Sequence, residues 1–334
     1  MKQLQKLKLW VEGARPKTIP AAITPVIVGT ASVSDNTFMT FRFILAILVS
    51  VSLQVGVNYA NDYSDGIRGT DEERVGPRRL VGSALIPARN VKFAALLAFG
   101  FACACGLSLA IMTSIWLIGI GLLSVLAGWF YTGGKTPYGY RGLGEVSVFI
   151  FFGLVATAGS AFVQIETFSG LAIVSSIPVG FLAMALLVIN NLRDIETDTE
   201  TDKRTLAVLL GAKRTQNLFL FLVFSSVTLY CLFSFFSSLL ALLVLACLPL
   251  CAKILRLVRK DMSSQVHIKV LELTAKLHMT SGGLYALGLW IGLLMLNLLA
   301  REQLRGPGNK QAPMDILKTC VLNHFNYLFV GGKV

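Results

Sequence analysis

Apolar residues recur along this chain in stretches long enough to cross a membrane as helices, and polar residues gather between them. A helix needs about 20 residues to cross a hydrocarbon layer about 30 Å thick. The pattern therefore predicts an all-α, polytopic integral membrane bundle of about nine transmembrane helices. Pro20 and Pro25 lie in the short first stretch and predict a tilted or broken helix there. The expected spans are 18–33, 41–61, 92–112, 114–132, 143–164, 170–190, 216–236, 238–251 and 278–299.

The composition supports this interpretation. Of 334 residues, 54% are hydrophobic and only 14% are charged. These proportions exclude a disordered chain, a disulfide scaffold, a coiled coil and a soluble nucleotide-binding enzyme.

Charge between the spans predicts the orientation. Most of the 30 Lys and Arg residues fall on the face that also holds the N-terminus, and the C-terminal tail is the exception. By the positive-inside rule, we expect a multi-pass protein of the cell membrane with its N-terminus in the cytoplasm. The net charge of +12 then reflects contact with anionic headgroups of membrane lipid, and nucleic acid is not an expected partner. The predicted organisation is a cytoplasmic amphipathic arm (1–17), a nine-helix membrane domain (18–300) and a C-terminal tail of unknown role (301–334).

Acidic residues concentrate in two short segments. Five of the 18 Asp and Glu residues lie within 62–73 and five within 194–202, each directly after a span. Four predicted crossings separate the segments. Because four is even, both segments are expected on the same, cytoplasmic side of the membrane.

Helical spacing groups the polar side chains of each segment. Residues three or four positions apart share a helix face. Asn58, Asp62 and Asp65 would form one stripe, and a second would contain Asn190, Asp194, Asp198 and Asp202. Carboxylate and amide oxygens suit Mg²⁺, which proteins usually hold with one or two carboxylates plus substrate phosphates.

Basic residues surround both segments and could bind the phosphate oxygens that the metal leaves free. They are Arg68, Arg74, Arg78, Arg79, Lys135, Arg141, Arg193, Lys203 and Arg204. The alternative is that the acidic residues are solvated loop charges or helix caps, and that Arg78 and Arg79 are positive-inside anchors. Two matched clusters on one face favour the functional interpretation.

At these residues the chain resembles the UbiA-type membrane prenyltransferases, and within them the members that act on 1,4-dihydroxy-2-naphthoate in menaquinone synthesis. The resemblance covers roughly residues 10–300. One departure concerns the first motif, where Gly69 stands at the position of a third carboxylate and Asp71 follows two residues later. The supporting segments are 14–18, 61–71, 75–80, 131–134, 138–145 and 190–194.

The resemblance implies a nine-helix fold, Mg²⁺ as cofactor, and a polyprenyl diphosphate whose chain is transferred to dihydroxynaphthoate with loss of CO₂, giving demethylmenaquinol. Tyr131 and Tyr138 are candidates for lining the substrate site, but they could also belong to the aromatic belt at the membrane interface. The candidates are Asp62, Asp65, Asp194 and Asp198 for the metal; Asn58, Asn61, Asp71, Asn190, Asn191 and Asp202 for the metal or its surroundings; Arg68, Lys135, Arg141, Arg193 and Lys203 for the diphosphate; and Tyr131 and Tyr138 for lining the substrate site.

The residues bear on three alternative functions. A prenyltransferase for 4-hydroxybenzoate differs only in its acceptor, and no side chain distinguishes the two. A CDP-alcohol phosphotransferase requires a motif that residues 65–69 do not supply. A cation-coupled transporter would place its acidic groups near the bilayer midplane, whereas these follow the ends of spans.

Overall fold

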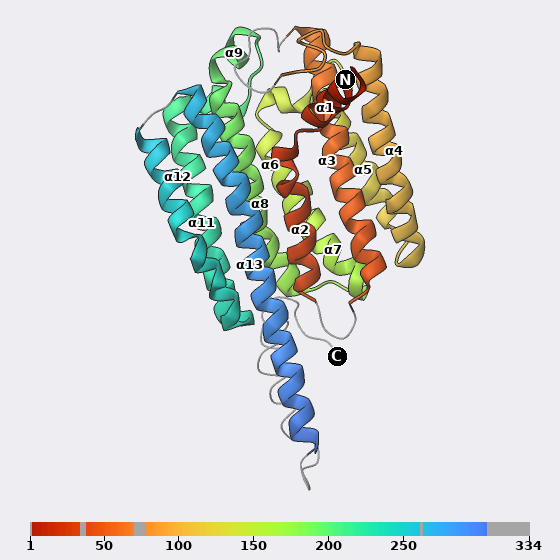
Figure 1. The fold of residues 1–334 in the computed structure, drawn as a ribbon, viewed down its shortest axis with the longest axis vertical. Helices are drawn as coiled ribbons and strands as arrows, with labels where there is room; N and C mark the ends of the chain where they lie inside the picture. The colour runs from red at the N-terminus through yellow and green to blue at the C-terminus, as the bar shows by residue number, and fades with distance from the viewer. Residues whose placement is uncertain (1, 34–37, 70–77, 261–262, 306–334) are drawn as a thin grey trace.

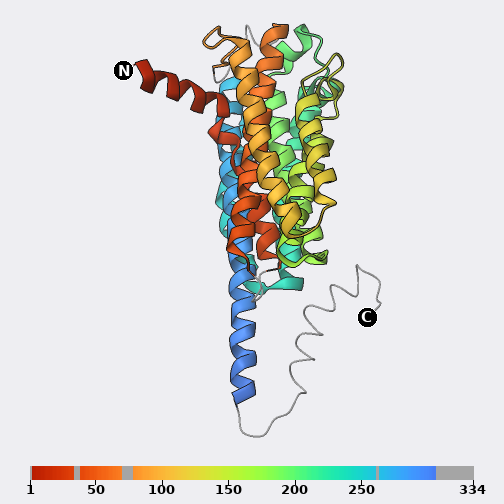
Figure 2. The same cartoon turned by 90° about the vertical axis from the view of Figure 1, so that its right-hand side faces the viewer.

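The computed structural model describes residues 2–33, 38–69, 78–260 and 263–305. Within these ranges the chain is helical and contains no strand, which confirms the all-α prediction. The helices form an elongated bundle, with α1 projecting from one end (Figures 1 and 2). Their bounds are α1 Lys2–Ala14, η1 Pro16–Thr18, α2 Pro20–Ala31, α3 Thr40–Arg68, α4 Ala88–Met112, α5 Leu117–Phe130, η2 Tyr138–Arg141, α6 Gly144–Val148, η3 Phe149–Val155, α7 Ala156–Ile165, α8 Gly170–Arg193, α9 Ile195–Glu200, α10 Leu206–Leu210, α11 Ala212–Ser237, η4 Leu239–Cys247, α12 Leu248–Lys260 and α13 Ser264–Arg305.

The multi-pass character is confirmed, since seven helical segments in the described ranges are long and apolar enough to cross a membrane. Two shorter apolar helices, α2 and α5, coincide with the remaining expected spans. The segment 144–165 combines α6, the π-helix η3 and α7, and the segment 239–260 combines η4 and α12.

Several helix ends differ from the prediction in ways that affect the acidic clusters. Helix α3 continues seven residues past the expected end at 61 and stops at Arg68 because Gly69 takes a left-handed conformation, with φ 74°. Helix α8 ends at Arg193, and Asp194 has a non-helical ψ of 10°. The predicted unbroken helical stripe from Asn190 to Asp202 is therefore wrong.

Helix α13 is also longer than expected. It begins at Ser264, well before position 278, and continues to Arg305, so that the first five residues of the expected tail belong to it. A helix of 42 residues is about 63 Å long. It extends beyond the rest of the bundle at the end opposite α1 (Figure 2).

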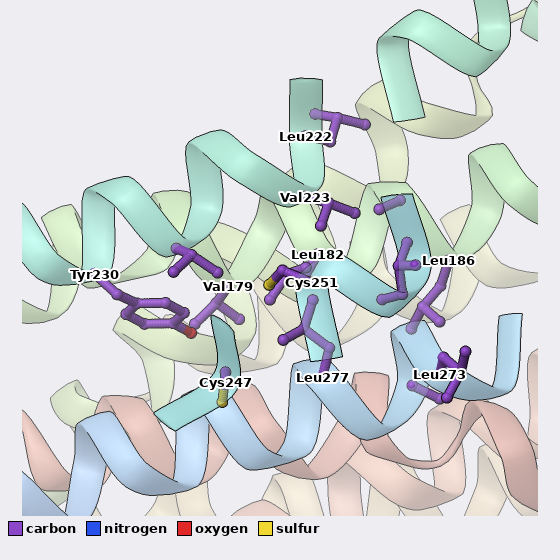
Figure 3. Packing of buried hydrophobic residues seen from close by; sticks show 14 of the residues in the cluster. Val179, Leu182, Leu186, Leu222, Val223, Tyr230, Cys247, Cys251, Leu273 and Leu277 are labelled. Carbon is purple, nitrogen blue, oxygen red and sulfur yellow. The ribbon is translucent and has the colours of Figure 1, made fainter. Parts of the chain in front are cut away.

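The main hydrophobic core lies between α8, α11, η4, α12 and α13. Figure 3 shows its centre, where Leu182 of α8, Val223 of α11 and Leu277 of α13 pack together. Tyr230 and Tyr285 extend the core with ring centroids 4.7 Å apart. This half of the molecule is closely packed, whereas the other half encloses a cavity.

The end of the bundle opposite α1 is joined by a buried arginine. Arg42 of α3 donates to the carbonyls of Met112 at 2.9 Å and Val163 at 3.0 Å. It also pairs with the half-exposed Glu166 at 2.8 Å. One guanidinium therefore ties together the ends of α3, α4 and α7.

Helix α5 is the least enclosed of the apolar helices. None of its residues is buried. It packs on α3 and α4 rather than on α6, η3 or α7, which follow it in the chain. The space between α5 and those later segments belongs to the cavity described next.

Candidate active site

A cavity of about 870 Å³ runs through the half of the bundle formed by α2, α3, α5, η3, α7 and α8. Along α3 its lining extends from Asp65 to Ala46, which at 1.5 Å per residue is about 28 Å. Polar and charged side chains occupy one end, and apolar residues such as Leu109, Leu117 and Val163 occupy the other. The cavity thus suits a ligand with a charged head and a long apolar tail. The expected site residues that line it are Asn58, Asn61, Asp62, Asp65, Tyr131, Tyr138, Asn190, Asn191, Arg193 and Lys203.

The first acidic cluster lies within α3. Asp62 is 1% exposed, and its carboxylate accepts the backbone N–H groups of Leu80 and Val81, each at 2.9 Å. Asp65, one turn later, accepts a hydrogen bond from the Tyr140 hydroxyl at 2.7 Å. Both carboxylates are held in place by neutral donors.

The second cluster follows α8 and extends through α9. The Arg193 guanidinium forms a fork with Asp194 in which both N–O distances are 2.7 Å. Asp198 lies 3.3 Å from the Lys203 ammonium and accepts from the Thr205 hydroxyl at 3.4 Å. Arg193 and Lys203 line the cavity, whereas the buried Asp194 and Asp198 stand behind them.

Asp202 lies apart from the other aspartates. Its backbone is left-handed, with φ 56°, and its side chain is 93% exposed. Its partner is Arg204, also exposed, at 3.7 Å. Because the helix is interrupted after α8, Asp202 lies at the surface. Asp71, the alternative third carboxylate of the first motif, lies outside the described residues.

Tyr140 links the two clusters. Its hydroxyl donates to Asp65, and the Lys203 ammonium stands over its ring at 5.2 Å from the centroid. Lys203 in turn pairs with Asp198. The structure therefore brings both clusters together at the end of the bundle where α1 and α9 lie, as Figure 1 shows.

The basic residues around the cavity differ in part from those expected. Arg68, Lys135 and Arg141 are exposed and do not line it. Arg68 instead donates to the carbonyls of Thr132 and Gly134, which fixes the loop after α5. Of the five expected diphosphate ligands, Arg193 and Lys203 have their side chains at the cavity.

Other cations reach the cavity that the expected diphosphate set did not include. Arg15 adopts a left-handed backbone, with φ 54°, and lies close enough to Asp62 to stabilise its charge. The signal for Lys8, Arg15 and Lys17 was the polar segment just before the first span, whereas Arg78 and Arg79 were already among the basic residues around the first acidic segment. The additional lining cations are Lys8, Arg15, Lys17, Arg78 and Arg79.

Tyr131 and Tyr138 form an aromatic pair on the cavity wall. Their ring centroids lie 5.6 Å apart with the planes at 78°. The Tyr138 hydroxyl donates to the Ala127 carbonyl at 2.8 Å and lies 2.9 Å from the Ser147 hydroxyl. Burial raises the pKa of Tyr138, so its phenol is neutral at physiological pH.

The donor chemistry at the polar end fits Mg²⁺ bound together with a diphosphate. In the described part of the chain, no three His, Cys, Asp or Glu side chains converge as a ready metal cluster. Mg²⁺ sites that depend on substrate phosphates need only one or two carboxylates. Asp62 and Asp65, together with amide oxygens nearby, satisfy that requirement.

The family is decided by comparison with known sequences. Residues 22–273 match the model of the UbiA prenyltransferase family. The chain belongs to this family. The UbiA-type resemblance noted from the sequence is therefore confirmed.

Within the UbiA family, the chain is similar to enzymes of one named activity. A 1,4-dihydroxy-2-naphthoate octaprenyltransferase of Mycobacterium tuberculosis is 48% identical over 211 residues, which cover 63% of this chain and 72% of the relative. The enzyme of the same name from Escherichia coli is 35% identical over 299 residues, covering 86% and 97%.

Solved structures agree on the fold. A UbiA homolog from Archaeoglobus fulgidus bound to DMAPP and Mg²⁺ has a TM-score of 0.52 at 14% identity and covers 96% of both chains. A structure described as digeranylgeranylglyceryl phosphate synthase in membranes has a TM-score of 0.57 at 18% identity, covering 87% of this chain and 99% of the other. At these identities the likeness establishes the fold alone.

Proposed function

We propose that this UbiA-family protein transfers a polyprenyl chain from its diphosphate to 1,4-dihydroxy-2-naphthoate. In this reaction the allylic carbon–oxygen bond breaks, diphosphate leaves, and a carbon–carbon bond forms at the ring carbon that bears the carboxylate. The carboxylate departs as CO₂ and returns its electron pair to the ring, which gives demethylmenaquinol. The observation that carries the proposal is one cavity with two Asp/Asn clusters at its polar end and apolar walls beyond.

The polar end is assigned to the diphosphate. Asp62, Asp65, Asp194 and Asp198 would hold Mg²⁺, which would neutralise the negative charge that develops on the leaving diphosphate. Arg193 and Lys203 line the cavity and would bind the phosphate oxygens.

According to this proposal, substrate binding gives the cations and carboxylates of the second cluster new partners. Asp194 and Asp198 are each paired with a cation that lines the cavity. A diphosphate would draw Arg193 and Lys203 towards its oxygens and free the two carboxylates for the metal. The resting pairs therefore keep the buried charges satisfied until substrate arrives.

The acceptor and tail are assigned to the rest of the cavity. Tyr131 and Tyr138 would flank the aromatic acceptor, since offset and edge-on arrangements of aromatic rings are favourable. The apolar walls of α5, η3 and α7 would hold the prenyl tail and keep water from the allylic cation.

The transferase proposal predicts Mg²⁺-dependent product. Protein purified into lipid nanodiscs, given labelled polyprenyl diphosphates of several lengths, dihydroxynaphthoate and Mg²⁺, should form prenylated quinol and CO₂. EDTA should abolish the product, and added Mg²⁺ should restore it. Parallel reactions with 4-hydroxybenzoate test the other acceptor, and prenylation of that ring alone would reject the assignment. Ion flux in liposomes with no prenylated product would favour a transporter.

The orientation is proposed from the charge pattern. Helix α1 carries Lys6 and Lys8, exposes Leu4 and Leu7, and lies at the same end of the bundle as α9. We assign this end to the cytoplasm, with residues 1–17 as an amphipathic arm on the membrane surface and the residues after α13 as a tail.

Cysteine labelling tests the orientation. Cysteine at Lys6 or Thr199 should react with a membrane-impermeant maleimide in inside-out vesicles and not in right-side-out vesicles. Phe168, exposed in the link between α7 and α8, provides the matched control, because cysteine there should react in the opposite preparation. Labelling of positions 6 and 168 in the same preparation would contradict the assignment.

A further inference from the structure

A buried carboxylate beside the cavity is only half satisfied. Glu145 of α6 is 2% exposed. Its Oε1 accepts a hydrogen bond from the Asn191 amide nitrogen at 3.0 Å. Its Oε2 has no hydrogen-bond partner within the described residues. Because an unsatisfied buried polar group is costly, and a charged one more so, the position of Glu145 requires a physical reason.

The four asparagines of the polar end differ in the direction of their amide oxygens. In Asn58, Asn61 and Asn190, Oδ1 accepts a hydrogen bond from another side chain, so that oxygen is already engaged within the protein. The donors are Gln54 to Asn58 at 3.2 Å, Thr132 to Asn61 at 2.8 Å, and Arg193 to Asn190 at 2.9 Å. These contacts occupy one of the two lone pairs of each of the three oxygens.

Asn191 is oriented the opposite way. Its NH₂ group donates to Glu145. The oxygen and nitrogen of an amide lie in one plane on either side of the Cβ–Cγ bond axis, so Oδ1 is turned away from the carboxylate that Nδ2 meets. Asn191 itself lines the cavity, whereas Glu145 does not. The amide oxygen is therefore the atom that Asn191 presents to a ligand.

We propose that Glu145 is a positioning residue that holds the Asn191 amide with its oxygen towards the cavity, where that oxygen is a neutral ligand for the cation bound with the diphosphate. The inference rests on the proposed function. A carboxylate has no hydrogen to donate when ionised, so it accepts only the NH₂ side of an amide and fixes its direction. Partners of this kind orient metal ligands in many proteins.

Mn²⁺ binding in the presence of inorganic pyrophosphate tests the inference without turnover. Mn²⁺ takes the same oxygen ligands as Mg²⁺, and the loss of its free electron paramagnetic resonance signal measures binding. We would compare the unsubstituted protein with Glu145→Ala, Glu145→Gln, Asn191→Ala and the Glu145→Ala/Asn191→Ala double variant, all in nanodiscs. A thermal melt of each variant reports whether it is folded.

Glu145→Ala and Asn191→Ala should each raise the Kd for Mn²⁺ by about 10-fold or more. The double variant should bind no more weakly than either single one, because the two residues act as one unit. Glu145→Gln keeps an acceptor oxygen and nearly the same shape but can also donate, so its Kd should lie between those of the unsubstituted protein and Glu145→Ala.

Three results would overturn the inference: unchanged affinity in Glu145→Ala, additive losses in the double variant, or Glu145→Gln as weak as Glu145→Ala. The last would mean that negative charge, not amide direction, is what Glu145 supplies. Absence of Mn²⁺ binding by the unsubstituted protein would reject the metal assignment as well. Product formation in the transferase assay would still be judged independently.

Discussion

Asp62→Asn is expected to lower kcat by about 10²–10³-fold or more, because it removes a carboxylate from the proposed site of the metal and diphosphate. The protein should remain folded. Asn keeps one oxygen for the backbone N–H groups of Leu80 and Val81, so the loss in unfolding free energy should not exceed about 1–3 kcal/mol.

Single-turnover prenyl transfer and a thermal melt in the same nanodisc preparation check this result. Glu200→Gln is the matched control, since Glu200 lies on the exposed side of α9. It neutralises a carboxylate near the site and should leave the rate unchanged. Full activity in Asp62→Asn would reject the assignment of α3 to the metal.

Asp194→Asn should reduce both activity and stability. The sequence alone predicts that this change relieves crowded negative charge and leaves the fold intact. The structure corrects this prediction, because Asp194 forms a two-bonded fork with Arg193, whose side chain is 2% exposed. Removing one partner of a buried ion pair costs about 3–5 kcal/mol, so we expect a clear fall in the melting temperature.

Pyrophosphate with Mg²⁺ should partly restore the stability of Asp194→Asn, because a bound diphosphate supplies a new partner for Arg193. The prenyl transfer rate should stay at least about 10²-fold below that of the unsubstituted protein. Glu196→Gln, an exposed change two residues away, should show neither effect. A melting temperature equal to the unsubstituted one would contradict the fork, and a normal rate would contradict the metal role.

Periodicity and composition were sufficient for the fold because long apolar stretches in a membrane have few alternatives to helices. Each of the nine expected spans coincides with an apolar helical segment of the described chain. The ends were harder to predict. Gly69 signals the end of α3 through its backbone freedom, whereas the break at Asp194 coincides with a local ion pair between Asp194 and the adjacent Arg193 that helical spacing does not reveal.

The candidate site was predictable where chemistry sits beside the spans. Asp62 and Arg193 follow directly from acidic and basic residues at helix ends. Glu145 was not predicted, since its partner Asn191 is remote in the sequence and a glutamate at the start of a span usually contacts solvent. Arg68 was predicted as a diphosphate ligand, but its guanidinium donates to the carbonyls of a loop and does not line the cavity.

Helix α5 gives the chamber one compliant side. It contributes Leu117, Gly121 and Ser124 to the lining, yet none of its residues is buried. The segments that follow it in the chain lie on the other side of the cavity. A wall backed by lipid can yield at less cost than one inserted in a protein core, where rearrangement disturbs close packing. We therefore expect donors of unequal length to be accommodated by outward displacement of this helix, while the rigid body around α8 keeps the reacting ends in register.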